Sequence, residues 1–231
     1  MSKGITIWPV KPYKMIIAGP SNCGKTRFLL NTLIDTYAKD KFSQIFIFAP
    51  AMSINQTDYK SLEDKYGDAI VKHEGLPTED EASEIFTAIQ EERDASDKYN
   101  ALFIVDDLMG SVNKGKFLQN VMTAASHHLG ISIIFLQQKH FVEGSGRTAR
   151  LNCDYFVAFQ LHSDKASFGR IAKSIEPEHW KELMAKFEKI TSKPYCPLII
   201  DFKSMYQNWP SQYHYRDGWW DKGIKFDWSE D

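Results

Sequence analysis

The chain has 231 residues, with 28 lysines and arginines against 30 aspartates and glutamates and a formal net charge of −2. This balance disfavours a basic protein that coats nucleic acid, although a local basic patch can still bind it. Three cysteines, an odd number without the spacing of a metal site, indicate reduced thiols in a cytosolic compartment. The length predicts one large α/β domain with a sizeable core.

The clearest motif follows a possible edge strand at 5–8, where the apolar run 14–18 leads into Gly-x-x-x-x-Gly-Lys-Thr. This is the pattern of the phosphate-binding loop of P-loop NTPases, in which glycines let successive N–H groups point at an anion. Lys25 is expected to reach the β- and γ-phosphates, and the Thr26 hydroxyl to ligate Mg²⁺. A helix to about Lys39 then presents its N-terminus to the phosphates. The candidate nucleotide-binding residues are Gly19, Pro20, Ser21, Asn22, Cys23, Gly24, Lys25, Thr26 and Arg27.

The next elements are predicted from periodicity. The apolar run 44–50 ends in proline and indicates a strand buried on both faces. Residues 58–66 read weakly as a helix, and 69–73 as a short strand. Thr78 and Glu81 occupy the two positions of a capping box, which predicts a helix to about Arg93.

The second informative stretch, 101–108, is an apolar strand that ends in Asp106 and Asp107. An acid at the end of such a strand, downstream of a phosphate loop, is the Walker B pattern. Asp106 is expected to hold the Mg²⁺ shell through water, and Asp107 is the nearest candidate to polarise the attacking water. The alternative for Asp107 is a helix cap or a loop acid.

The rest of the chain alternates helices and strands. A helix from 117 to about 129 precedes a buried strand at 131–138, which ends in two glutamines. A basic loop at 141–150, a strand at 154–159, helices at 163–174 and 177–190, and a last strand at 198–202 complete the expected domain, 1–204. The tail, 205–231, holds four of the six tryptophans. It fits equally an arm packed on its own domain and an arm that docks on a neighbouring subunit or a larger assembly.

The order of these motifs resembles the FtsK–HerA superfamily of DNA-translocating ATPases, and most closely the poxvirus A32-like genome packaging ATPases. The matching segments are 19–26, 103–108, 133–138 and 150–156, of which the last is the more family-specific. The resemblance implies an α/β fold, the three-layer P-loop NTPase sandwich of RecA/ASCE type. Its central sheet would be mostly parallel, with a sensor strand between the Walker A and Walker B strands. ATP and Mg²⁺ are the implied cofactors.

The resemblance also implies two catalytic residues. Gln138 fits the polar sensor, with Gln137 as the alternative, because an amide can both donate to the γ-phosphate and orient the water. An amide that only satisfies the strand end is the structural alternative. An arginine finger for the neighbouring subunit fits Arg150, with Arg147 in reserve, and would stabilise charge on the transferring phosphoryl group. Asp107 departs from many P-loop ATPases, which have glutamate there, and its shorter side chain puts its identity as the base in question.

The function implied by the resemblance is an ATP-hydrolysing motor that pumps double-stranded viral DNA into a preformed capsid. It would work as a homo-oligomeric ring, with a capsid or vertex protein as a further partner, in the host cytoplasm or the virion. The candidate contacts to DNA phosphates are the loop residues Lys114, Lys116, Lys139, His140 and Arg147, with plain solvated surface as the alternative. No apolar run is long enough to span a bilayer. A P-loop nucleoside or small-molecule kinase and a non-catalytic nucleotide-dependent scaffold are the alternative functions.

Overall fold

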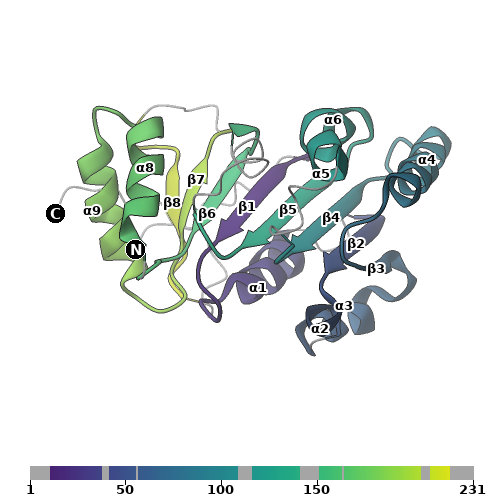
Figure 1. The fold of residues 1–231 in the computed structure, drawn as a ribbon, viewed down its shortest axis with the longest axis horizontal. Helices are drawn as coiled ribbons and strands as arrows, with labels where there is room; N and C mark the ends of the chain where they lie inside the picture. The colour runs from purple at the N-terminus through teal and green to yellow at the C-terminus, as the bar shows by residue number, and fades with distance from the viewer. Residues whose placement is uncertain are drawn as a thin grey trace.

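The computed structural model describes residues 11–37, 42–55, 57–108, 116–140, 151–162, 164–203 and 209–218. Within these ranges, eight strands form one sheet in the order β3-β2-β4-β5-β1-β6-β7-β8 (Figure 1). The strands from β3 to β6 run parallel, and β7 and β8 each pair antiparallel with the strand before. The expected α/β fold with a mostly parallel central sheet is confirmed.

The strands are β1 (Lys14–Ala18), β2 (Gln44–Ala49), β3 (Ile70–Glu74), β4 (Ala101–Asp106), β5 (Ser132–Gln137), β6 (Tyr155–Ala158), β7 (Leu198–Asp201) and β8 (Tyr213–Tyr215). The helices before β4 are α1 (Lys25–Arg27), its π-helical continuation η1 (Phe28–Tyr37), α2 (Ala51–Ile54), α3 (Thr57–Tyr66), the 3₁₀ turn η2 (Gly67–Ala69) and α4 (Glu79–Ala95). After β4 come α5 (Lys116–Asn120), the π-helical η4 (Val121–Ala125), α6 (Ser126–His128), α8 (Lys165–Ile175) and α9 (Trp180–Thr191). In the part of the chain that the structure describes, no helix has both the length and the apolar composition to cross a bilayer.

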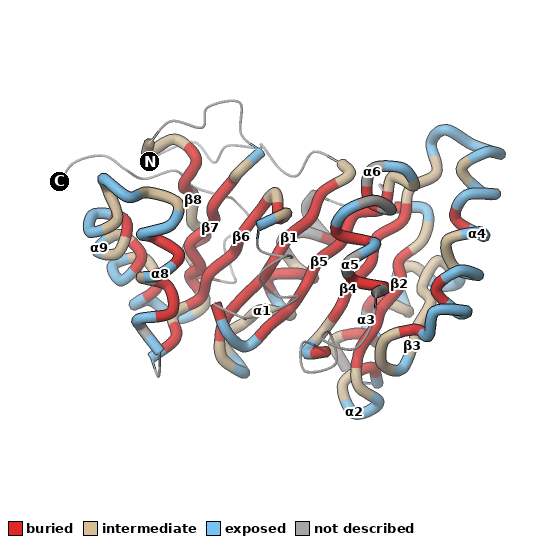
Figure 2. The backbone as a smooth tube through the Cα atoms, turned by 45° about the horizontal axis from the view of Figure 1, so that its top comes forward, coloured by how far each residue is buried: buried red, intermediate tan, exposed pale blue. Residues whose placement is uncertain are grey.

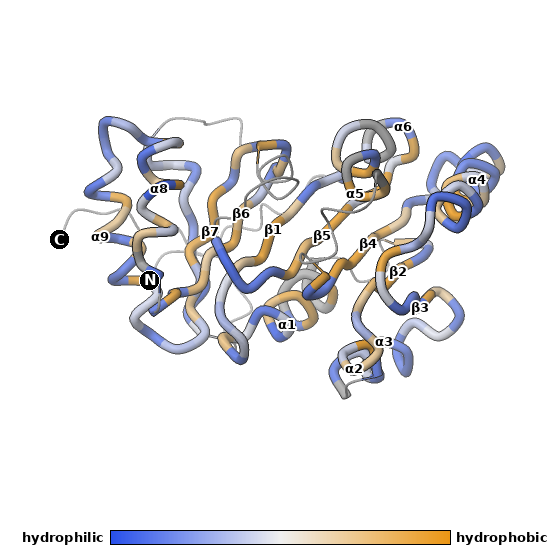
Figure 3. Tube along the Cα trace, viewed as in Figure 1, coloured by the Kyte–Doolittle hydropathy of each residue, from blue (hydrophilic) through white to orange (hydrophobic). Residues whose placement is uncertain are grey.

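Three layers follow from the alternation of side chains along each strand. On one face of the sheet, Ile16 and Ala18 pack in a core with residues of α4, α5, η4, α8 and α9. On the other face, Met15 and Ile17 pack with residues of η1 and α3. Because both faces are covered, the central strands are buried along their length, and the polar residues gather on the outer helices (Figures 2 and 3).

The sheet order brings the phosphate loop, the two acids and the two glutamines together, at the carboxyl-terminal ends of three neighbouring strands. β5 lies between β1 and β4, so the expected position of the sensor strand is confirmed. In the register, Ala18 is opposite Gln137, and Asp106 is opposite Leu136. The ends of the Walker A, sensor and Walker B strands therefore lie side by side, as parallel strands require.

The capping box is confirmed, and one strand was missed. The Thr78 hydroxyl accepts from the Glu81 backbone N–H, and the Glu81 carboxylate accepts from the Thr78 N–H at 2.7 Å. The expectation that 198–202 forms the last strand is wrong, because β8 pairs with β7. Trp209, just before β8, stacks on the His179 ring at 4.9 Å between centroids, so this part of the tail packs on the domain. The expected edge strand at 5–8, the loop 141–150 and the rest of the tail lie outside the described residues.

Candidate nucleotide-binding site

The loop between β1 and α1 has the geometry of a sharp strand-to-helix turn. Asn22 (φ 62°) and Gly24 (φ 100°) take left-handed backbone conformations that reverse the chain direction. A side chain at Gly19 has no room, because its Cβ would lie 2.6 Å from Phe159 Cβ and 2.7 Å from Cys23 Sγ. The motif therefore occupies the position of a phosphate loop, after a buried strand and before a helix.

Lys25 is held across this loop. Its Nζ donates to the carbonyl oxygens of Gly19 and Pro20, both at 2.9 Å. This keeps the ammonium beside the backbone N–H groups that would surround a phosphate. Thr26 is half-buried directly after it, while Arg27 is exposed with its guanidinium 3.8 Å from the Asp58 carboxylate of α3.

Asp106 ends β4 and accepts a hydrogen bond from a buried tyrosine. The Tyr59 hydroxyl of α3 donates to Asp106 Oδ2 at 2.8 Å. Burial raises the pKa of the Asp106 carboxyl above its ordinary value, and the Tyr59 hydrogen bond and the Lys25 ammonium only partly offset this. Burial also raises the pKa of Tyr59 well above its ordinary value, so this hydroxyl remains a donor.

The two glutamines at the end of β5 have different roles in the geometry. Gln138 is exposed, and its Nε2 donates to Asp107 Oδ2 at 2.8 Å. Asp107 itself is exposed, directly after β4, in a left-handed conformation (φ 52°). Gln137 is buried, and its Nε2 donates to the Lys139 carbonyl at 2.7 Å. Of the two amides, Gln138 therefore contacts the acidic pair, whereas Gln137 satisfies the strand end.

The donor set fits a magnesium ion held together with phosphates. Mg²⁺ prefers oxygen ligands, keeps several waters and is commonly bound by one or two protein side chains plus substrate phosphates. The Thr26 hydroxyl and the Asp106 carboxylate offer oxygen atoms of this kind. Among the described residues there is no group of three or more His, Cys, Asp or Glu side chains that could enclose a metal alone.

One candidate DNA contact is wrong. His140 is 1% exposed, donates from Nε2 to the Phe159 carbonyl at 2.6 Å, and lies among the rings of Phe156, Phe168 and Phe187. Burial lowers the pKa of His140 to about 4, so the ring is neutral near neutral pH. A buried neutral ring cannot grip a DNA phosphate.

Only some of the other basic residues proposed to contact DNA or to act as the finger lie in the described part of the chain. Lys139 is exposed directly after Gln138. Lys116 begins α5, and only its backbone is described. Lys114, Arg147 and Arg150 lie outside the described residues.

The sequence reasoning missed Tyr59. Its spacing from Leu62 in a polar helix indicates a buried face, and a buried tyrosine hydroxyl usually has a hydrogen-bond partner. The spacing does not name the partner, because Asp106 is 47 residues away in the chain.

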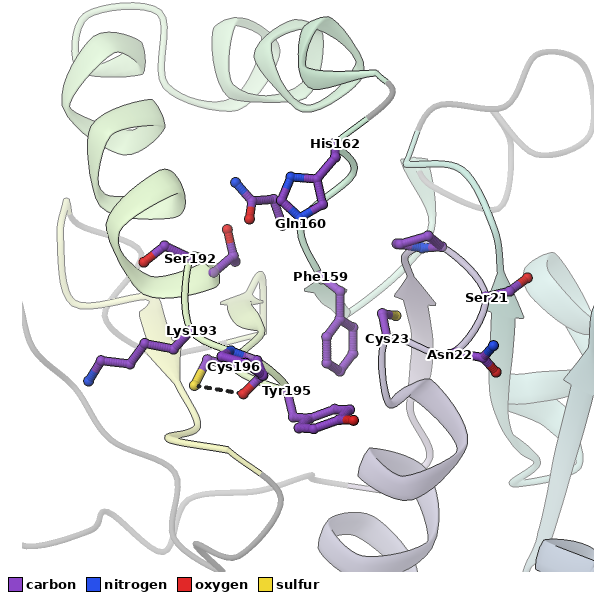
Figure 4. Close-up of a pocket in the computed structure, with 13 residues that line it drawn as sticks. Ser21, Asn22, Cys23, Phe159, Gln160, His162, Ser192, Lys193, Tyr195 and Cys196 are labelled. Atoms are coloured by element: carbon purple, nitrogen blue, oxygen red, sulfur yellow. Dashed lines mark hydrogen bonds between the residues drawn. The ribbon is translucent and has the colours of Figure 1, made fainter.

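A pocket of about 340 Å³ opens beside the phosphate loop (Figure 4). It is lined by Pro20, Ser21, Asn22 and Cys23 of the loop, by Phe159, Gln160 and His162 after β6, and by residues 191–196, which run from the last residue of α9 toward β7. The pocket is therefore on the β6 side of the loop, whereas Asp106 and Gln138 are on the β4 and β5 side.

Solved structures share this architecture. The genome packaging NTPase B204 from Sulfolobus turreted icosahedral virus 2, in complex with sulfate, is 18% identical with a TM-score of 0.60, over 89% of this chain and 96% of that chain. The same protein in complex with ATP-gammaS is 17% identical with a TM-score of 0.59, over 89% and 97% of the two chains. The cytoplasmic domain of the Thermomonospora curvata type VII secretion ATPase EccC is 13% identical with a TM-score of 0.54, over 84% and 24%. These likenesses show the P-loop NTPase fold.

Sequence comparison gives the family. No curated protein matches the chain significantly. The family model described as Poxvirus A32 protein matches residues 8–203, a range that contains the phosphate loop, both acids and both glutamines. Since this match covers most of the 231 residues, the chain belongs to the Poxvirus A32 protein family.

Proposed function

We propose that this protein is a viral genome packaging ATPase, which hydrolyses ATP with Mg²⁺ and moves double-stranded DNA into a capsid. The observation that carries the proposal is the convergence of Lys25, the Asp106–Asp107 pair and Gln138 at one edge of the sheet, in a chain of the Poxvirus A32 protein family. B204, which has the same fold, is described as a genome packaging NTPase and has been solved with ATP-gammaS and AMPPCP.

Each residue has a role in this reaction. Lys25 neutralises charge on the β- and γ-phosphates. Thr26 directly, and Asp106 through water, would hold the Mg²⁺ ion, which would supply Lewis acidity to the phosphoryl oxygens. Asp107 accepts a proton from the attacking water, whose oxygen bonds to the γ-phosphorus as the bond to the β–γ bridging oxygen breaks. Gln138, at 2.8 Å from Asp107, orients that carboxylate and the water. The products are ADP and phosphate.

The finger is proposed to act between subunits of a ring. Leu151, the residue after Arg150, is 64% exposed. Asp154, just beyond it, accepts from the backbone N–H of Lys14, where β1 begins. The phosphate loop follows the other end of β1, about 15 Å away at 3.3 Å per residue. Leu151 is therefore remote from the nucleotide of its own subunit, which supports Arg150, adjacent in the sequence, as a finger in trans.

The competing functions make different products. A nucleoside kinase would transfer the γ-phosphoryl group to an acceptor, and a scaffold would bind nucleotide without turnover. The family and the likeness to B204 favour the motor.

The test is a phosphate-release assay with and without long double-stranded DNA, beside a mass measurement of the assembly. We expect Mg²⁺-dependent turnover that rises with DNA, and an assembly of several subunits. Lys25→Ala should abolish turnover and retain the wild-type circular dichroism spectrum, because it removes a cation that acts on phosphates and not on the core. Normal turnover by folded Lys25→Ala, or a phosphorylated nucleoside as product, contradicts the proposal.

A further inference from the structure

We propose that the pocket of about 340 Å³ beside the phosphate loop holds the base and sugar of the nucleotide. We further propose that Tyr195 contacts the base through its ring, so that the site takes nucleoside triphosphates with little preference among bases. This inference rests on the proposed function, because it concerns the part of the same nucleotide site that would bind the base and sugar instead of the phosphates.

The direction of a bound nucleotide follows from the sheet. The acids and Gln138, which act on the γ-phosphate, lie at the ends of β4 and β5, on one side of β1. The nucleoside end of the triphosphate must therefore leave the loop on the other side, toward β6 and β7. The pocket lies there, and its volume is within the range of about 300–1,000 Å³ that is usual for ligand pockets.

Tyr195 forms the aromatic wall of this pocket. It takes a left-handed backbone conformation (φ 61°), which is uncommon and costly for a bulky residue. In this conformation its ring reaches the phosphate loop, where a Cβ on Gly24 would lie 2.8 Å from Tyr195 Cδ1. Figure 4 shows the rings of Tyr195 and Phe159 beside Cys23 of the loop. A flat ring beside the phosphates is suited to pack against any base, since every base has a π-face.

The polar side chains of the pocket do not form a set of hydrogen-bonding groups that would select one base. Its buried polar side chains are Thr191, whose hydroxyl donates to the Phe187 carbonyl at 2.7 Å, and Cys196, whose sulfur accepts from the Gly218 N–H at 3.0 Å. Both side chains thus already make hydrogen bonds to the protein backbone. Four other polar side chains line it from the segments that follow β6 and α9, and all are half-buried or exposed: Gln160, His162, Ser192 and Lys193. Strong discrimination requires buried polar groups that a wrong base leaves unpaired. Among the described lining residues, none meets that requirement.

The experiment compares nucleotides with inorganic tripolyphosphate, which has the phosphates but no nucleoside. Calorimetric titrations of the full chain with Mg²⁺ should give affinities for ATP, GTP, CTP and UTP within about tenfold of one another. Each should bind about tenfold or more tightly than tripolyphosphate, the effect expected from one aromatic contact to a base. A preference above about a hundredfold for one base overturns the inference.

Two variants test the pocket itself. Tyr195→Ala should weaken ATP binding about tenfold and leave tripolyphosphate binding unchanged, which also shows that the variant is folded. Tyr195→Phe, which keeps the ring, should bind ATP like the wild type. Ser192→Trp adds a large side chain at an exposed position of the lining and should likewise weaken ATP but not tripolyphosphate.

The outcomes separate this inference from the proposed function. Tripolyphosphate binding that depends on Lys25, together with unchanged ATP affinity in Tyr195→Ala and Ser192→Trp, overturns the pocket and leaves the ATPase standing. Failure of the wild type to bind either ATP or tripolyphosphate overturns the proposed function, and the pocket with it.

Discussion

Asp106 is subject to two opposing demands. It must be ionised to hold a cation, yet its burial at the end of β4 favours the neutral acid and raises its pKa. The Tyr59 hydroxyl donates to one of its oxygens and so favours the charged form, as does the Lys25 ammonium. Tyr59 therefore favours the ionised form of Asp106, in addition to its packing in the core.

Removal of that hydroxyl should weaken the response to Mg²⁺. Tyr59→Phe keeps the buried ring but leaves Asp106 with one donor fewer, so the Mg²⁺ concentration for half-maximal turnover should rise about threefold to tenfold. Saturating Mg²⁺ should restore most of the rate. A Mg²⁺ titration of the ATPase reaction measures this effect.

Tyr66→Phe is the matched control, because that hydroxyl, on the same helix, contacts the Ile34 carbonyl at 3.5 Å instead of Asp106. It should leave the Mg²⁺ titration unchanged. An equal shift in both variants would show that the effect comes from the packing of α3.

The two adjacent acids should separate binding from turnover. Asp106→Asn should weaken Mg²⁺-dependent nucleotide binding. Asp107→Asn can still accept the Gln138 hydrogen bond but is a poor base, so ATP should bind normally and hydrolysis should slow about a hundredfold or more. Calorimetry and single-turnover assays measure the two steps, with the exposed loop acid Asp97→Asn as the control. Normal hydrolysis by Asp107→Asn would assign the base to another group.

Local spacing predicted the phosphate-loop and Walker B residues, because the loop motif and the acid after an apolar strand are contiguous in the chain. Tyr59 and Tyr195 could not be predicted in this way. Tyr59 finds Asp106 across 47 residues, and Tyr195 reaches Gly24 only through a left-handed turn that the sequence does not signal. His140 was misplaced for the same reason: its position after a strand suggests a surface loop, but the rings of α8 and α9 cover it.

At the scale of elements, long apolar runs were the reliable signal. The cores of β2, β4 and β5 were all expected from such runs, since both faces of the sheet are covered. Helix ends were less certain. The helix expected from 163 begins at Lys165, because the Asp164 carboxylate accepts from the Ser167 N–H at 3.0 Å and caps it. β8 was missed because a strand of three residues is too short to show a period.

Trp209 offers a test of what the described part of the tail does. Its ring stacks on His179 at the start of α9 and meets Tyr213 of β8 edge-on at 5.3 Å. Trp209→Ala should therefore lower the free energy of unfolding by about 2 kcal/mol, less than the loss of a fully buried tryptophan. Chemical denaturation measures this, and Met52→Ala, at a side chain 90% exposed, should change it by less than about 0.5 kcal/mol. Wild-type stability with loss of assembly would instead make Trp209 a docking anchor.

At the scale of the whole molecule, the proposed catalytic residues are divided between the carboxyl-terminal and the amino-terminal ends of the parallel strands. Lys25, Asp106, Asp107 and Gln138 meet where the parallel strands end. The segment around Leu151 and Asp154 lies where those strands begin. If Arg150 is the finger, a subunit would hold its nucleotide where the strands end and supply the finger from the segment where they begin, so each complete site would need a neighbouring subunit.

Arg150→Ala should expose this division. A finger that acts in trans contributes little to ATP binding and much to turnover, so the variant should bind ATP nearly normally and lose hydrolysis about a thousandfold if the reaction depends strongly on the finger. Calorimetry and DNA-stimulated phosphate release measure the two effects. Full turnover by the variant would exclude Arg150 as the finger.

Mixed rings show whether the arginine acts on a neighbour. Arg150→Ala and Lys25→Ala subunits are each expected to be inactive alone, but a mixed ring contains interfaces where an intact phosphate loop faces an intact Arg150. Those interfaces should recover part of the ATPase activity if subunits exchange and neighbours do not have to fire in strict order. An arginine that acted only within its own subunit would give no recovery, because every subunit would then carry one defect. Recovery with Arg147→Ala in place of Arg150→Ala, where Arg147→Ala alone is inactive, would assign the finger to Arg147, since only the loss of the true finger can be complemented across an interface.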